Sequence, residues 1–378
     1  MSPAGAGVGR LIARKEVVIC AGSGGVDKTT TSAAIAAGVA AQGRSAAVLT
    51  IDPAKRLANS LGLTELGNEE RQVDPARLDA AGLGGDGELW AMMLDAKRTF
   101  DDLVATHAPD DTTRDAVLSN PIYRELSNAV AGSQEYMAME KLHELHLEGR
   151  YDLLVLDTPP TRNALDFLDA PRRLARFIDS KSLSFFRGAS KAGLGIFGRG
   201  TGLLFSVMKR ATGVDLLQDL AEFFNSFGGM TDGFRERAER VEALISDSRT
   251  TFLLVTSPRA ASIDEARYFA RKLAADDLPL GGVVANRVRE PVRGAGGGRL
   301  QTELTKVLDP ELARKVGRNL EEQRDLAERD AHNLDLLRKR MGRKPLVVVP
   351  ELPGDVHDLD GLAAMGEHLF SAEALRAG

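Results

Sequence analysis

The sequence predicts an α/β fold with a mainly parallel β-sheet flanked by helices. Three observations support this: seven short apolar runs, helical patterns between them, and a glycine-rich turn directly after the first run. The runs lack the alternation of polar and apolar residues that marks a half-exposed strand, which indicates strands buried on both faces. Strands alternating with helices are typical of βαβ units, whose helices cover both faces of a parallel sheet.

The predicted strands are spread along most of the chain. They are EVVICA (16–21), AAVLTID (46–52), LWAMMLD (89–95), YDLLVLD (151–157), TFLLVT (251–256), LGGVVAN (280–286) and PLVVVP (345–350). Helical patterns lie between them, for example over 28–42 and 261–275. The spacing of strands and helices therefore favours one sheet built from several distant parts of the chain.

Two intervals lack a strand pattern. Residues 161–250 have helical periodicity around a Gly-, Phe- and Leu-rich tract (182–210), and we expect an inserted helical subdomain there. Residues 291–344 open with RGAGGG and continue as a charged helical stretch, which predicts a second insertion. The α/β core would then comprise residues 16–160, 251–290 and 345–378, after a flexible N-terminus over residues 1–15.

Composition and charge exclude several classes of function. The net charge of −5 gives no basic surface, so we expect no nucleic-acid partner. Cys20 is the only cysteine, which excludes an internal disulfide or a Cys-x-x-Cys zinc site, and its apolar run predicts a buried structural thiol. His143 and His146 lie three residues apart without an H-E-x-x-H motif, and we expect a pair on a helix surface rather than a metal site.

The N-terminus lacks the apolar core of a signal peptide. The apolar stretches are shorter than the roughly 18–20 residues that a membrane-spanning helix needs. We therefore expect a cytoplasmic protein, which can still bind at a membrane surface.

The first predicted strand runs directly into GSGGVDKTTT (22–31), a candidate phosphate-binding loop. Such a loop needs glycines so that backbone N–H groups can surround phosphate oxygens, a lysine for the terminal phosphates and a hydroxyl for Mg²⁺. Lys28 and Thr29 stand where the lysine and the hydroxyl belong, which predicts an ATP and Mg²⁺ site on a P-loop NTPase fold. The predicted nucleotide-binding residues of the loop are Gly22, Ser23, Gly24, Gly25, Val26, Asp27, Lys28, Thr29 and Thr30.

Asp27 departs from the motif, because it stands where G-x-x-x-x-G-K-[ST] has its second glycine. A carboxylate about 5 Å from a phosphate charge costs roughly 3 kcal/mol at an effective dielectric near 20, which Lys28 and Mg²⁺ would partly offset. The substitution also adds a Cβ at a position where the motif has the conformational freedom of glycine. Asp27 therefore leaves two hypotheses open: the chain is an ATPase, or it has a degenerate loop on an ATPase fold that has lost its activity.

Two more predicted strands end in an aspartate at the sheet edge where ligands bind in open parallel sheets. The second strand ends at Asp52, and the strand 151–157 ends at Asp157 in the Walker B arrangement, whose carboxylate holds the Mg²⁺ shell, often through water. Gly22-x-Gly24 followed by Asp52 also resembles a dinucleotide-binding fingerprint, which keeps a nicotinamide- or flavin-dependent oxidoreductase as a remote alternative. The Lys-Thr-Thr run has no role in that fingerprint.

These motifs, in their order along the chain, resemble those of the arsenical pump-driving ATPase family. This family includes the ATPases that deliver tail-anchored membrane proteins. The counterparts here are GSGGVDKTT, IDPAKRLANSLG, DTPPTRNALDFLD, VVANR and VVVPELPGDV, which span about residues 16–365. The chain looks most like the actinobacterial, anion-transporter ATPase-like members.

The resemblance implies a role for each matching residue. Lys28 would contact the β- and γ-phosphates, and Thr29 would bind Mg²⁺, with Asp157 in the metal's outer shell through water. Asp52 would orient or activate the attacking water. ATP bound with Mg²⁺ would then be hydrolysed to ADP.

The resemblance also implies a dimeric switch, either a homodimer or a heterodimer with a paralogous ATPase. ATP hydrolysis would drive a conformational change of the helices 161–250, which would face a membrane-protein client or partner. Asn286 and Pro350 would frame the adenine. Ser23 stands where the family has a lysine that reaches the partner's phosphates, and Arg162 is the candidate substitute.

Two departures define the alternative hypothesis. With Asp27 in the loop and no lysine at Ser23, the chain could be a catalytically impaired nucleotide-binding subunit or a non-catalytic partner of a paralogous ATPase. The single cysteine excludes the zinc-clamped dimer and the three-cysteine arsenite site found in other branches of the family.

Overall fold

The computed structural model describes residues 7–52, 55–121, 123, 133–159, 230–291, 297–371 and 375–376. The strands of this part of the chain are β1 (Val17–Gly22), β2 (Ala46–Thr50), β3 (Arg71–Gln72), β4 (Leu89–Met93), β5 (Leu153–Asp157), β6 (Thr250–Thr256), β7 (Leu280–Val288), β8 (Leu346–Pro350) and β9 (Leu375–Arg376). All seven predicted strands are present, with bounds shifted by one or two residues.

Within the described residues, the strands form one sheet in the order β3-β4-β2-β5-β1-β6-β7-β8-β9. The neighbouring pairs from β4 to β8 are parallel, which confirms the predicted α/β fold with a mainly parallel sheet. The edge strands β3 and β9 pair antiparallel with their neighbours. The sequence does not predict them, because each has only two residues and therefore no apolar run.

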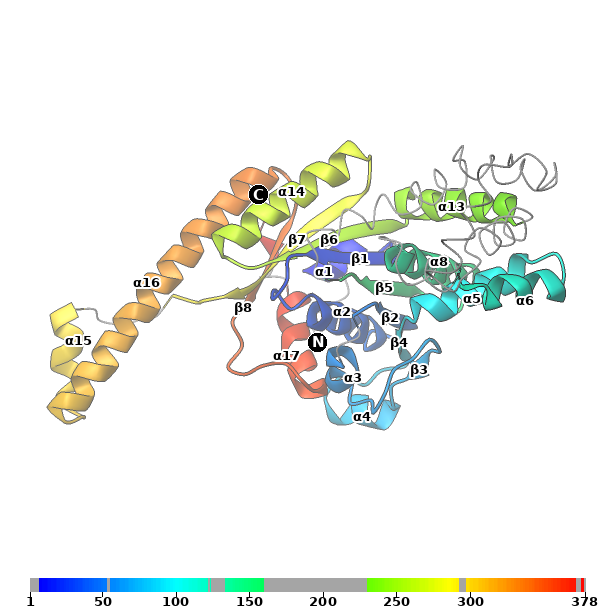
Figure 1. Cartoon of the computed structure of the whole chain (residues 1–378). Coiled ribbons are helices and arrows are strands. Elements are labelled where there is room, and N and C mark those ends of the chain that lie inside the picture. Colours follow the sequence, from blue (N-terminus) through cyan, green and yellow to red (C-terminus); the bar gives the residue numbers. More distant parts are fainter. Residues whose placement is uncertain are drawn as a thin grey trace, which may run out of the picture.

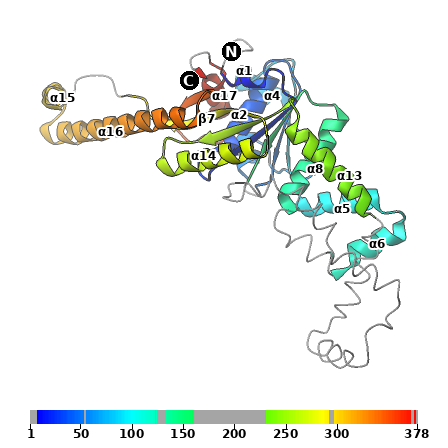
Figure 2. The ribbon, with the colours of Figure 1, turned by 90° about the horizontal axis from the view of Figure 1, so that it is seen from above.

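Helices cover both faces of the sheet (Figures 1 and 2). One face carries α1 (Val8–Ile12), α2 (Lys28–Ala40), α3 (Arg56–Ser60), α4 (Pro75–Ala80) and α17 (Leu359–Leu369). The other face carries α8 (Ser133–Glu148), α13 (Thr231–Ser246) and α14 (Ala260–Ala275), with α5 (Ala96–His107) packed on α8 and α6 (Asp111–Ser119) packed on α5. The sheet is thus the middle layer of three, as its uniformly apolar strands predict.

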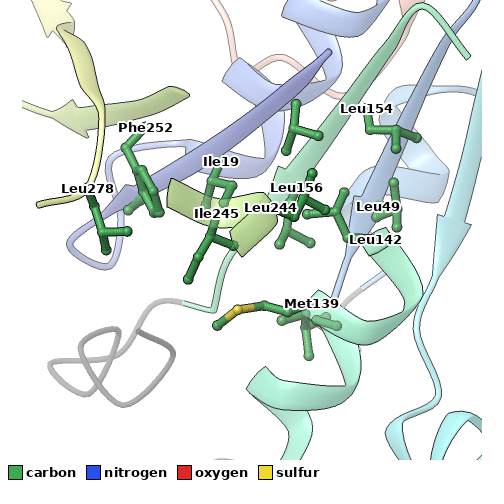
Figure 3. Packing of buried hydrophobic residues seen from close by; sticks show 14 of the residues in the cluster. Ile19, Leu49, Met139, Leu142, Leu154, Leu156, Leu244, Ile245, Phe252 and Leu278 are labelled. Atoms are coloured by element: carbon green, nitrogen blue, oxygen red, sulfur yellow. The ribbon is translucent and has the colours of Figure 1, made fainter. Parts of the chain in front are cut away.

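The strand residues alternate between two hydrophobic clusters. In β1, Val18 and Cys20 pack in the cluster with α2 and α17, whereas Val17 and Ile19 pack in the cluster with α8 and α13. Figure 3 shows this second cluster, with strand residues such as Ile19, Leu49 and Leu156 beside Met139 and Leu142 of α8 and Ile245 of α13. Because both faces are covered, every residue of β1 is buried.

The N-terminal segment differs from its prediction. We expected a flexible stretch over residues 1–15, but residues 8–12 form α1, in which Val8 and Ile12 are buried. Both side chains belong to the same cluster as Phe370, which follows α17, so burial of apolar surface holds this helix against the body. Two apolar residues four positions apart are too few to predict such a short helix from sequence.

A helical arm projects from the sheet in both views (Figures 1 and 2). It consists of α15 (Gly297–Leu304) and α16 (Pro310–Met341), within the interval 291–344 whose leucine spacing predicts helix. Asp309 caps α16 by accepting hydrogen bonds from the backbone N–H groups of Glu311 and Leu312. The C-terminal part of α16 packs on the core through Leu334, Leu337 and Met341.

Most of the interval 161–250, including the whole tract 182–210, lies outside the described residues. The described part of the interval contains the helix α13, and the client-facing role expected for the interval stays a prediction. The domain boundaries therefore stay a prediction. Across the described residues, no helix combines the length and the apolar character that crossing a membrane requires. His143 on α8 is only 5% exposed, so the expectation of a surface histidine pair was wrong for this residue.

Candidate nucleotide site

The glycine-rich loop lies between β1 and α2, in the middle of the sheet. Gly22 ends β1 with φ 153°, and a Cβ on it would lie 2.0 Å from the carbonyl oxygen of Val255 on β6, so only glycine fits there. Gly25 also has a positive φ, of 73°. The loop delivers the chain to Lys28, the first residue of α2, and the N-terminus of a helix carries free N–H groups suited to an anion.

The ammonium group of Lys28 lies inside the loop. Its Nζ donates to the carbonyl oxygen of Ser23 at 2.9 Å, and the residue is 5% exposed. Burial lowers the pKa of Lys28, although the negative charge of Asp157 opposes this shift. A phosphate oxygen entering the loop could take the place of the Ser23 carbonyl and supply the compensating negative charge.

Asp157, at the end of β5, receives hydrogen bonds from two threonines. Thr29 Oγ1 donates to its Oδ2 at 2.6 Å and Thr50 Oγ1 donates to the same oxygen at 2.9 Å. The parallel pairing of β2 with β5 sets Thr50 directly opposite Asp157, which explains the second contact. The backbone N–H of Asp52 donates to Thr50 Oγ1 at 3.1 Å, so Asp52 joins the same group.

The carboxyl group of Asp157 is buried and only partly satisfied. Burial raises its pKa to about 6, against the hydrogen bonds from Thr29 and Thr50 and the charge of Lys28. Its Oδ1 atom is buried and has no hydrogen-bond partner among the described residues. A buried carboxylate oxygen without a partner, beside a threonine hydroxyl, is a favourable position for a bound cation or its water.

These oxygens fit Mg²⁺. This ion binds oxygen ligands, keeps several waters and uses one or two carboxylates together with substrate phosphates. The described residues contain no group of three or more His, Cys, Asp or Glu side chains that could hold a metal ion by themselves. The Thr29 hydroxyl and Asp157 would therefore hold Mg²⁺ together with phosphate and water oxygens.

A cavity of about 610 Å³ adjoins the loop. Its lining includes Asp27 and Thr30, Arg56 of α3, and both residues predicted to frame the adenine, Asn286 at the end of β7 and Pro350 at the end of β8. This volume is typical of small-molecule sites, which range over roughly 300–1,000 Å³. The arrangement leaves room for a base and sugar next to the phosphate loop.

Asp27 turns its carboxylate toward this cavity wall. Arg287 Nε donates to Oδ2 at 2.5 Å and Arg287 Nη2 donates to Oδ1 at 3.0 Å. Asn286 Nδ2 lies 3.3 Å from Asp27 Oδ2 and 3.2 Å from the carbonyl oxygen of Val26, and donates to both. Sequence reasoning missed Arg287, although it directly follows Asn286 in VVANR.

The structure thus brings together Lys28, Thr29, Asp52 and Asp157 on one side of the loop and Asn286 and Pro350 on the other. Ser23 is 8% exposed, and its Oγ has no hydrogen-bond partner among the described residues. Arg162, the candidate substitute for the missing lysine, lies outside those residues. Cys20 is a free, buried thiol, as predicted, and burial raises its pKa to about 12.

Comparisons with known proteins match most of this chain. The family model of anion-transporting ATPases matches residues 15–293, which include the loop, both strand-end aspartates and Arg287. The chain is 26% identical over 280 residues to ATPase get3 of Aspergillus terreus, covering 74% of each protein. It is 25% identical to the ATPase GET3 proteins of Malassezia globosa, over 279 residues, and of Podospora anserina, over 281 residues, again over 74% of each protein.

Proposed function

The chain belongs to the anion-transporting ATPase family, and from that premise we propose that it is an ATP-dependent dimeric switch that hydrolyses ATP with Mg²⁺. The observation that carries the proposal is the contact between Thr29 and Asp157 beside the buried Lys28. A hydroxyl, an ammonium group and a carboxylate with one oxygen that lacks a partner among the described residues thus lie around one loop, and P-loop phosphoryl transfer uses these three kinds of group.

The reaction is an in-line attack of water on the γ-phosphate. Lys28 exchanges the Ser23 carbonyl for phosphate oxygens and, with the loop N–H groups, stabilises the charge that develops there. Asp52 orients the attacking water and accepts its proton. Thr29 and Asp157 would hold the metal, which would neutralise negative charge on the phosphates.

The proposal includes an assembly. The chain works as a homodimer or with a paralogous ATPase, and nucleotide-dependent closure drives a conformational change linked to a client or membrane partner. This part rests on the resemblance of the motifs to those of the family. The chain would act in the cytoplasm, with transient binding at a membrane surface.

A second candidate function rests on Asp27. A carboxylate in the phosphate loop, together with Ser23 in place of a lysine, favours a chain that binds nucleotide poorly and serves as the non-catalytic partner of an active paralogue. A dinucleotide-dependent oxidoreductase has less support, because Lys28 and the contact between Thr29 and Asp157 have no role in such a site.

The test is calorimetric titration of ATP, with and without Mg²⁺, together with phosphate release, on the wild type and on Asp27→Gly. Lys28→Met serves as the control without the loop ammonium. We expect Mg²⁺-dependent binding and turnover in both proteins, and neither in the control.

Two results would change the assignment. Binding and turnover in Asp27→Gly alone would support the non-catalytic partner. No ATP binding in either protein, with NADH binding instead, would replace the ATPase with an oxidoreductase.

A further inference from the structure

The backbone of Asp27 has a conformation that glycine adopts readily. Its φ of 61° and ψ of 45° lie in the left-handed helical region, where glycine is at ease and aspartate is one of the few other residues found repeatedly. Lys28 therefore still begins α2 and reaches back to Ser23 as the motif requires. The difference that Asp27 makes to the loop is mainly its charge.

The carboxylate of Asp27 does not cap α2, although the residue occupies the N-cap position. Its hydrogen bonds go to Arg287 and Asn286 on the end of β7 instead. Nε and Nη2 of Arg287 each contact one carboxylate oxygen of Asp27, in the fork geometry that arginine forms with carboxylates. This contact joins two elements that are 260 residues apart in the chain.

Arg287 is held in an uncommon conformation to make this contact. Its φ is 59°, which residues with a Cβ rarely adopt, and the pairing of β7 with β8 shifts register between Ala285 and Val288. Both partners of the ion pair thus have a left-handed backbone. Such conformations persist where the surrounding contacts favour them, and they are concentrated at functional sites.

We propose that Arg287 is a positioning residue for ATP binding, which turns the Asp27 carboxylate away from the phosphates and neutralises its charge. The inference rests on the proposed function, since it concerns the same nucleotide site. It explains how a loop with an acidic residue at the glycine position can still accept a polyanion. Arg287 acts through Asp27, and it matters only because Asp27 is there.

Solvent exposure of the two side chains limits how strongly Arg287 can neutralise the charge of Asp27. The side chains of Asp27 and Arg287 are 28% and 40% exposed, so solvent partly screens the pair. The charge that Arg287 cancels lies on the residue next to Lys28, near the place where the phosphates would sit. We therefore expect loss of Arg287 to weaken ATP binding by about 10- to 100-fold rather than abolish it.

The experiment is a double-mutant cycle on Mg²⁺-ATP affinity, measured by calorimetry on the full chain. The variants are Asp27→Gly, Arg287→Ala and the two combined, with Arg287→Lys as the conservative change. Arg249→Ala, which removes a partly exposed arginine that pairs with Asp247, is the matched control. Thermal unfolding without nucleotide establishes that each variant is folded.

We expect Arg287→Ala to weaken ATP binding, Arg287→Lys to restore part of it, and the combined variant to bind within about threefold of Asp27→Gly. The loss should grow with phosphate charge, so adenosine should be almost unaffected, ADP intermediate and ATP most affected. A purely structural role for Arg287 would reduce the affinity for all three ligands alike. If Arg287→Ala does not fold, the cycle is closed with Arg287→Lys.

Three results would overturn the inference: Arg287→Ala binding ATP as well as the wild type, the combined variant failing to recover, or an equal loss for adenosine. Any of these, with ATP still bound by the wild type, leaves the proposed function in place. Absence of ATP binding in both the wild type and Asp27→Gly overturns the proposed function and the inference together.

Discussion

Thr29, in the first turn of α2, donates its hydroxyl hydrogen bond to Asp157 at the end of β5, at 2.6 Å. The two residues are 128 positions apart in the chain, and the parallel sheet brings them together because β1 and β5 are neighbours. In the proposed mechanism the same hydroxyl binds Mg²⁺. The geometry therefore predicts that Thr29 changes partner when metal and nucleotide arrive.

Replacing the Thr29 hydroxyl should remove the Mg²⁺ dependence of ATP binding. In Thr29→Val a methyl group of similar size cannot bind the metal, so adding Mg²⁺ should no longer tighten binding. Thr29→Ser keeps the hydroxyl and is expected to retain most of the effect. The measurement is ATP titration in Mg²⁺ and in EDTA, and a Thr29→Val protein that still responds to Mg²⁺ would contradict the role of this residue.

Lys28 should be needed for ATP binding, and its buried charge should lower the stability of the nucleotide-free protein. Burial lowers the pKa of its ammonium group, which means that the site disfavours the charged form until an anion enters. We expect Lys28→Met to unfold at the same or a higher temperature than the wild type. ATP should no longer raise the unfolding temperature of this variant, whereas it does so in the wild type.

A lower unfolding temperature for nucleotide-free Lys28→Met would show that the bond from Lys28 to the Ser23 carbonyl outweighs the cost of burying the charge. Circular dichroism on both proteins, with and without Mg²⁺-ATP, separates these cases. The control is Lys15→Met, because the Lys15 side chain also donates to backbone carbonyls, those of Ser248 and Thr250, but precedes β1 whereas the loop follows it.

The left-handed backbone of Asp27 predicts different stabilities for two substitutions there. Asp27→Ala and Asp27→Gly both remove the ion pair with Arg287, but alanine disfavours a φ of 61° by about 1–2 kcal/mol and glycine does not. Asp27→Ala should therefore be less stable than Asp27→Gly by about 1 kcal/mol. Urea unfolding measures the difference, and equal midpoints would show that the loop has relaxed to another backbone conformation.

The buried side chain of His143 should make the protein less stable at mildly acidic pH than at neutral pH. Burial lowers its pKa to about 4, helped by the positive charges of Arg237, His146 and Arg240. Its folded pKa lies below the unfolded value near 6.5, so the unfolded chain takes up the proton first and stability falls as pH drops below about 6.5. Burial raises the pKa of Glu140, which therefore titrates in the opposite sense and offsets part of this effect.

Lowering the pH from 7.5 to 5 should reduce the free energy of unfolding of both proteins. We expect this reduction to be about 1–2 kcal/mol smaller for His143→Gln than for the wild type. Glutamine is neutral throughout, so the comparison isolates the histidine while Glu140 and Arg237 remain. Chemical unfolding at both pH values gives the difference. Parallel losses in the two proteins would mean that His143 is protonated in the native state without cost.

The sequence predicts the strands well, because the information for them is local. Apolar runs such as 153–157 are buried on both faces, and the loop motif sets the order of Lys28 and Thr29 directly. Sheet order then explains why Thr50 links Asp52 to Asp157, because β2 and β5 are parallel neighbours with Thr50 opposite Asp157.

Contacts between distant parts of the chain could not be predicted from the sequence. The partner of Asp27 is an arginine 260 residues away, and its contact depends on a left-handed residue at the end of β7. His143 follows the same helical pattern as a surface residue would, and its burial depends on packing against the second layer of helices. A sequence shows that Asp27 carries a charge, but only the fold shows what neutralises it.

The two ends of α16 should contribute differently to stability. Leu337 is fully buried in the core cluster, whereas Leu312, in the first turn of the same helix, is 44% exposed. Leu337→Ala should lower the free energy of unfolding by about 2–4 kcal/mol, because it removes core contacts and leaves a cavity. Leu312→Ala is the matched control and should change it by less than about 0.5 kcal/mol. Similar losses for both would mean that the start of α16 also packs against something in solution, which a concentration-dependent sedimentation experiment would identify as a second copy of the chain.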